Sequence, residues 1–190
     1  NLGPSGLRDA ALAGDARAQY EVAAIFGEGR AVPQDLAASA LWYERAATQG
    51  LAPAAYRLGN MYENGSGVET DLIKAKFWYE KAASFGNRMS MHNLASILAG
   101  GALGEQNFAE AAVWFERAAG LGLTDSQFNL GMLFARGLGV SQDLASSYKW
   151  FSIAAEAGDQ DAAQARDDIA RSLDAETVSR LQAELASWSP

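Results

Sequence analysis

Four tryptophans stand at equal intervals along the chain: Trp42, Trp78, Trp114 and Trp150 are each 36 residues apart. Each lies in a similar decapeptide that ends in glycine: LWYERAATQG, FWYEKAASFG, VWFERAAGLG and KWFSIAAEAG. Constant spacing without insertion or deletion is the signature of a repeat array. A unit of this length cannot bury its own apolar surface, so the chain is expected to fold as a stack of repeats.

The segment before each tryptophan has the pattern of an amphipathic helix. In the first repeat a small residue, Ala18, is followed at four-residue steps by Val22 and Phe26, and the other repeats show the same ladder. Apolar residues at this spacing lie on one helix face. A glycine that can adopt the left-handed conformation is expected to end each of these first helices. These glycines are Gly29, Gly65, Gly101 and Gly137.

The second helix of each repeat carries the tryptophan. Its start is marked by a residue whose side-chain oxygen can accept hydrogen bonds from free backbone amides, namely Asp35, Asp71, Asn107 and Asp143. A pair of alanines then allows close approach of helices, and a glycine marks the end. The ending glycines are Gly50, Gly86, Gly122 and Gly158. Each repeat is therefore predicted to be a helix–turn–helix hairpin.

The register divides the chain into a single repeat domain over residues 1–190. Residues 1–14 are expected to form part of a preceding second helix or an N-terminal cap, since the opening NLGPSG suggests a piece of a longer protein. The repeats are predicted at 15–50, 51–86, 87–122 and 123–158. Residues 159–190 are predicted to form a C-terminal capping hairpin, because Arg166 replaces the ladder leucine and an array end needs a polar face.

Composition excludes several classes of function. The hydrophobic share of 49% and the charged share of 20% are those of a globular protein. A net charge of −8 argues against a nucleic-acid partner, which gains affinity from basic residues. The acidic stretch from Glu156 to Glu176 is interpreted as a solvated face rather than a site for a basic partner. There is no cysteine, and no apolar run is long enough for membrane insertion of this segment.

The consensus L-G-x-x-Y, G-x-G-V-x-x-D-L and W-Y-x-[KR]-A-A-x-x-G resembles that of Sel1-like repeats. RLGNMYENGSGVETDL followed by FWYEKAASFG carries this likeness most fully, and it extends over roughly residues 14–165. The resemblance implies an all-α, right-handed α-solenoid related to tetratricopeptide repeats. It also implies a non-enzymatic protein-interaction scaffold whose first helices line the concave side.

The segment DLASSYKWFSIAAEAGDQDAAQARDDIARSL is similar to the end of the repeat region in alphaproteobacterial polar localisation factors of the PodJ type. That resemblance implies a periplasmic domain of a larger membrane-anchored protein. It would place polar organelles or envelope machinery and bind protein partners of the cell envelope. Two alternatives stay open: a periplasmic regulator that restrains an exopolysaccharide-type sensor kinase, and a module that binds peptidoglycan or another glycan.

No catalytic residue, metal ligand or cofactor is predicted. His92 is the only histidine, so a metal site or a histidine-dependent triad lacks its further members. Residues 146–149 match the S-x-x-K motif, but no K-T-G accompanies it and the motif falls inside the helix of Trp150. Recurring acids beside basic residues are interpreted as surface ion pairs; they are Glu44, Glu80 and Glu116.

Partner specificity is predicted at first-helix positions that vary between repeats while the apolar ladder stays fixed. The candidates are Tyr20, Tyr56, Arg57, Asn60, His92, Asn93, Ser96, Phe128, Asn129 and Met132, and Glu21 and Ala24 complete the same rows. Because an asparagine is hard to bury without hydrogen-bond partners, Asn60, Asn93 and Asn129 are expected to face the groove. The alternative for Tyr20, Tyr56 and Phe128 is a place in the core between helices.

Overall fold

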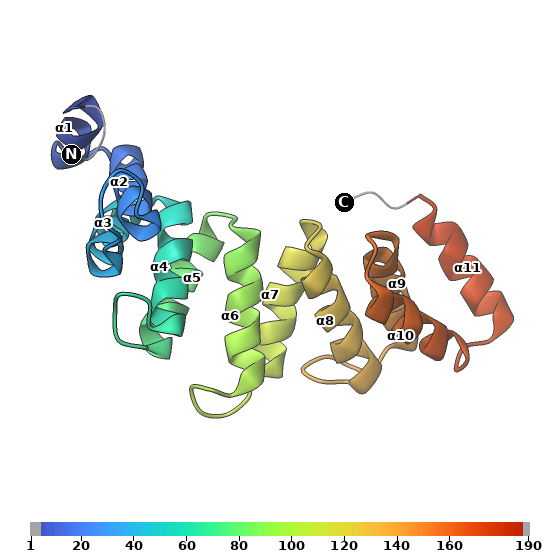
Figure 1. Cartoon of the computed structure of the whole chain (residues 1–190). Coiled ribbons are helices and arrows are strands. Elements are labelled where there is room, and N and C mark those ends of the chain that lie inside the picture. The colour runs from blue at the N-terminus through green and yellow to red at the C-terminus, as the bar shows by residue number, and fades with distance from the viewer. Residues whose placement is uncertain (1–4, 188–190) are drawn as a thin grey trace. The chain divides into compact units, whose positions relative to one another are not determined.

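The computed structural model describes residues 5–187, and all regular structure in that range is helical, in eleven helices. This confirms the all-α solenoid class. The chain divides into two compact units, with the boundary between Ser90 and Met91. The helices can be followed along each unit in Figure 1. The predicted end segments 1–14 and 159–190 include residues 1–4 and 188–190, which lie outside the described residues.

Unit 1 is built from consecutive helices that each pack on the next. They are α1 (Ser5–Leu12), α2 (Ala16–Glu28), α3 (Leu36–Thr48), α4 (Ala52–Asn64) and α5 (Leu72–Ser84). Helix α6 (Arg88–Gly100) spans the boundary between the two units.

Unit 2 continues the same alternation. Its helices are α7 (Phe108–Gly120), α8 (Thr124–Arg136), α9 (Leu144–Glu156), α10 (Gln160–Ala170) and α11 (Ala175–Leu185). Every helix from α2 to α9 has 13 residues, as a chain of equal repeats requires. Among the described helices, none combines the length and the apolar character needed to cross a membrane.

The predicted helix limits are confirmed by their cap geometry. At the start of α5 the Asp71 carboxylate accepts hydrogen bonds from the backbone amides of Ile73 and Lys74, both at 3.0 Å. The equivalent side chains cap the other second helices. At the end of α4, Gly65 has a φ of +69° and its amide donates to the carbonyl of Met61. Local chemistry therefore sets both ends of the repeat helices.

The turn inside the second repeat packs against the preceding hairpin. Gly67 has a φ of +75°, and a Cβ atom placed on it would lie 2.3 Å from the backbone carbon and oxygen of Leu36, at the start of α3. Gly139 makes the same approach to Phe108 in unit 2. In the first repeat this turn position is taken by Ala31, which adopts a positive φ of +63° although it is not a glycine.

The core of unit 1 lies between its first and second helices. Leu58 of α4, from the predicted ladder, is 1% exposed, and the alanines Ala46 and Ala82 of α3 and α5 are fully buried. Trp78 packs in the same cluster. Small alanines let the helices approach closely, so the ladder leucine of one helix reaches the neighbouring pair.

In unit 2, α9 is the helix on which α8, α10 and α11 pack. Phe151 of α9 is 1% exposed and packs with Ala154 and with Ala162 of α10. Helix α11 is held by Leu181, which is 2% exposed, and by an ion pair between Lys149 and Glu184. Most of the other residues of α10 and α11 are exposed or half-buried.

Candidate functional site

One row of candidate residues consists of rings that pack inside each hairpin. The ring pairs are Tyr20–Tyr43, Tyr56–Tyr79, His92–Phe115 and Phe128–Phe151, with centroids 5.3, 6.3, 5.5 and 5.5 Å apart. The first-helix ring of each pair is half-buried and its second-helix partner is buried. These aromatics therefore hold the two helices of a hairpin together and leave one part of each ring at the surface.

The next row along the first helices varies in chemistry. It contains an acid, a base and two amides: Glu21, Arg57, Asn93 and Asn129. Glu21 and Arg57 are exposed and the two asparagines are half-buried. The residues that follow them in the chain are the ladder Val22, Leu58, Leu94 and Leu130, and all four are buried. Fixed apolar positions and varied polar positions thus alternate on the same helices.

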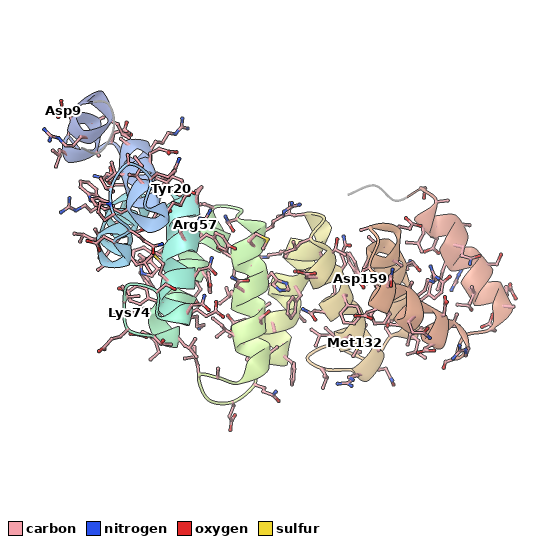
Figure 2. The ribbon with its side chains drawn as sticks, viewed as in Figure 1. Asp9, Tyr20, Arg57, Lys74, Met132 and Asp159 are labelled. Carbon is pink, nitrogen blue, oxygen red and sulfur yellow. The ribbon has the colours of Figure 1, made fainter. Side chains whose placement is uncertain are left out.

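In unit 1 Arg57 of the varied row contacts the ring row of the preceding first helix. Figure 2 shows Tyr20 on α2 and Arg57 on α4 close to one another. A hydrogen bond to Tyr20 raises the pKa of the Arg57 guanidinium, so the cation is held at this place on the surface. Beneath them, burial raises the pKa of Tyr43 to about 12, which keeps its hydroxyl neutral.

Asn60 is engaged within its own hairpin. The Tyr79 hydroxyl lies 2.7 Å from Asn60 Oδ1 and 2.5 Å from Glu63 Oε2, and its single proton can be donated to only one of them at a time. Asn60 itself is half-buried. Its replacement should therefore affect stability as well as surface chemistry, because Asn60 contacts the second helix in addition to the groove that the sequence predicts.

A pocket of about 220 Å³ opens beside these residues in unit 1. Arg57 and Asn60 of α4 line one side, and Ala24 and Glu28 of α2 line another. Its remaining lining comes from α2, α3, α4 and the turn after α4: Gly27, Leu36, Ser39, Tyr43, Met61, Asn64 and Ser66. A guanidinium and a carboxylate in one pocket suit a polar partner surface that carries both a donor and an acceptor.

In unit 2, His92 joins two first helices. Its Nδ1 lies 2.9 Å from the Ser126 hydroxyl, which connects α6 to α8. Burial lowers the pKa of His92 and the charge of Asp125 raises it, with burial the larger effect. Ser96, one turn along α6, is exposed and its hydroxyl donates to the His92 carbonyl. Met132 is half-buried and packs on the cluster around Phe151.

A pocket of about 370 Å³ brings His92, Phe128 and Asn129 together with residues that the sequence did not nominate. These are Asp125 on α8 and, around the start of α10, Asp159 and Asp161. The sequence assigned the last two to a solvated terminal face. Their place in the register, where first helices begin, was the signal that could have found them. Carboxylates and an amide around a cavity are complementary to a hydrogen-bond donor or a cation.

The structure brings the candidates together in two groups, each within one unit. Tyr20, Tyr56, Arg57 and Asn60 lie on α2 and α4, and the others lie on α6 and α8. Within the described part of the chain, no group of three histidine, cysteine, aspartate or glutamate residues is placed to hold a metal ion. The S-x-x-K residues serve the fold: the Ser146 hydroxyl donates to the capping Asp143 and Lys149 pairs with Glu184.

Comparison with known proteins identifies the repeat. The family model of the Sel1 repeat matches residues 16–51, 52–87, 88–123 and 124–159, one residue later than the predicted repeats. No curated protein sequence matches.

Among solved structures, a protective antigen of uropathogenic Escherichia coli strains with an SLR fold is 36% identical, with a TM-score of 0.78 over 84% of this chain. A Sel1 repeat protein from Oxalobacter formigenes is 34% identical, with a TM-score of 0.75 over 83% of this chain. The match spans 34% and 46% of the length of these two proteins.

The cysteine rich protein B of Helicobacter pylori is 21% identical, with a TM-score of 0.54, over 69% of this chain and 94% of its own; it shares the fold. Sel1 repeat proteins generally act as protein-interaction scaffolds, and their fold is typically non-catalytic. Four consecutive matches cover most of the residues, and the chain therefore belongs to the Sel1 repeat family.

Proposed function

We propose that this chain is a non-enzymatic scaffold that binds a protein partner through the first helices of each unit. One observation carries the proposal. On the first helices the central ladder position is aliphatic and buried in each repeat, while the adjacent row changes from acid to base to amide and reaches the surface. A row that the fold leaves free to vary is suited to recognise one partner among many.

The two units offer different chemistry to that partner. Unit 1 presents the Arg57 cation, held by Tyr20, beside Glu28. Unit 2 presents amides, the His92 ring and the carboxylates of Asp125 and Asp159. A partner that meets both units would need acceptors for the first and donors for the second. Such polar complementarity fixes register and selects against wrong partners.

We also propose a periplasmic location, as part of a membrane-anchored polar localisation factor that binds proteins of the cell envelope. The support is the likeness of residues 143–173 to the end of the repeat region in that type of factor. A regulator of an exopolysaccharide-type sensor kinase would use the same surface, and the identity of the captured protein separates the two. Peptidoglycan binding is less favoured, because the first-helix rings pack against second-helix rings, edge-on for Tyr20 and His92 and tilted for Tyr56 and Phe128.

Site-specific photo-crosslinking tests the first-helix face. A photoreactive amino acid at position 21, 57 or 129, expressed in an alphaproteobacterial host, should capture one envelope protein identified by mass spectrometry. Matched positions on second helices, Ala37 and Glu116, are exposed and should give no such product. Capture from the second-helix positions alone would overturn the assignment of the face. Capture of muropeptides without any protein would contradict the scaffold proposal and indicate a peptidoglycan-binding module.

Location needs a separate experiment. A fusion of the full-length native protein to alkaline phosphatase, with the enzyme at the C-terminus, should be active in intact cells, because this enzyme matures outside the cytoplasm. An inactive fusion that is stably expressed would contradict the periplasmic proposal and leave the first-helix face untouched.

A further inference from the structure

The second repeat contains a pocket that is separate from the first-helix pockets. It measures about 310 Å³ and lies where the end of α3, the start of α4 and the second half of α5 meet. Ala47 and Ala55 form its floor together with Trp78. Phe77, Lys81 and Phe85 of α5 and the α5–α6 turn line its outer part.

A single small residue accounts for this space. The register position of Ala55 is occupied by glutamine in the first and fourth repeats. Gln19 and Gln127 each donate from Nε2 to the carbonyl of an alanine at the end of the preceding second helix, at 3.1 Å in both cases. The methyl group of Ala55 cannot span that gap. The equivalent carbonyl, that of Ala47, therefore borders an open pocket.

The rim of the pocket exposes two large apolar side chains. Phe85 is 65% exposed and Phe77 is 47% exposed. At the register position of Phe85 the other repeats carry Gln49, Leu121 and Ala157, so an aromatic there is particular to this repeat. Phe77 packs edge-on against Trp78 with centroids 5.0 Å apart. Covering such rings with a partner would remove apolar surface from water, at about 25 cal/mol per Å².

The ammonium group of Lys81 lies beside the apolar rim. The other two lysines of α5 have partners: Lys74 lies 3.8 Å from Asp71 and Lys76 lies 3.1 Å from Glu80. Lys81 makes no ion pair within the described part of the chain, and its Nζ lies 5.5 Å from the centre of the Phe77 ring. An ammonium group without a carboxylate partner, beside exposed aromatic rings, favours a ligand that carries a carboxylate next to an apolar side chain.

We propose that this pocket binds a peptide segment of a partner protein that inserts one large apolar side chain and places a carboxylate on Lys81. A volume of about 310 Å³ is at the lower end of the roughly 300–1,000 Å³ typical of ligand pockets, which suits a single side chain. The pocket is distinct from the first-helix face, so this proposal can be tested independently of the proposed function.

Peptide display provides the test. A phage library of random 12-residue peptides is selected on the whole chain and counter-selected on the Ala55→Gln variant, which carries the side chain found in repeats one and four. The expected consensus is a large apolar residue with aspartate or glutamate within three positions. An enriched peptide should bind Ala55→Gln at least tenfold more weakly, since it loses its anchor pocket. Lys81→Glu should also weaken binding of the peptide, and Lys81→Arg should keep the affinity within about fivefold of that of the native chain.

The controls make failure visible. Lys76→Gln removes a charge from the same helix outside the pocket and should leave binding unchanged. Lys81 is an exposed position, so Lys81→Glu remains informative if Ala55→Gln loses its fold, which thermal denaturation reports. A consensus without an acidic residue, peptides that bind Ala55→Gln as well as the native chain, or no enrichment at all would each overturn the proposal.

Discussion

Replacing Gly67 with alanine tests how successive repeats are joined in unit 1. The substitution adds one methyl group in the turn between α4 and α5. The added Cβ would lie 2.3 Å from the carbonyl carbon and oxygen of Leu36, and these are backbone atoms that no side-chain rotation can move away. The residue must also keep a φ of +75°, a conformation that disfavours alanine.

The two effects can be added. Left-handed backbone costs a non-glycine residue about 1–2 kcal/mol, and forcing an extra methyl group into a packed region costs about 1–3 kcal/mol. Alanine also restricts the unfolded chain more than glycine does, and this offsets about 0.4–1 kcal/mol of the lost stability. Gly67→Ala should therefore lower the free energy of unfolding by roughly 1–4.5 kcal/mol, compared with the ~5–15 kcal/mol that stabilises a typical domain.

Gly86 supplies the matched control. Its φ is +84°, and nothing lies within 4 Å of a Cβ placed on it. Gly86→Ala therefore carries the backbone strain without the contact and should cost about 1 kcal/mol. Urea denaturation followed by circular dichroism at 222 nm gives both values. If the two variants differ by less than about 0.5 kcal/mol, the close packing of the turn on α3 is not present in solution.

Three further expectations follow from single residues. Ala31→Gly should raise the free energy of unfolding by about 0.5–1 kcal/mol, because Ala31 holds a φ of +63° that glycine adopts without strain. An unchanged midpoint in a urea titration would contradict this expectation. Burial lowers the pKa of His92 below 6.5, so the unfolded state takes up its proton first as pH falls. Stability should drop as pH falls from about 6.5 towards the folded pKa, and His92→Phe should flatten that part of the pH profile of the melting temperature. Leu181→Ala should weaken the packing of α11 by about 2–5 kcal/mol and speed amide hydrogen exchange in α11 but not in α2 to α5. Glu184→Gln removes an exposed ion pair and should change the exchange rates of α11 little.

Sequence reasoning reached the helix boundaries because their causes are local. The Asp71 carboxylate needs only the next three residues to cap α5, and Gly65 needs only its own missing side chain to end α4. The same holds for the repeat itself: an apolar ladder such as Val22 and its equivalents is buried wherever hairpins stack. The varied rows on the first helices were visible for the same reason, since they are defined by their offset from the ladder.

The chemistry of the site was decided by contacts between distant residues. The hydrogen bond from Tyr79 to Asn60, the pocket that Asp159 and His92 both line, and the hydrogen bond between Arg57 and Tyr20 each bring together residues that are distant in the sequence. Periodicity shows which face of a helix is polar. It does not show which atom on the next helix that face meets, because a small rotation or shift of one helix changes every pairing.

The pocket beside Lys81 shows this division most clearly. The 36-residue register, the alanine at position 55 and the aromatic at position 85 can all be found in the sequence alone. That their combination leaves a cavity of about 310 Å³ depends on how α3, α4 and α5 pack around the missing side chain. Sequence by itself determined the repeating hairpin, because the signals for helix ends and buried faces are short-range. Tertiary structure alone decided that the departure at Ala55 leaves a cavity, because a cavity is defined by the distances between atoms of several helices.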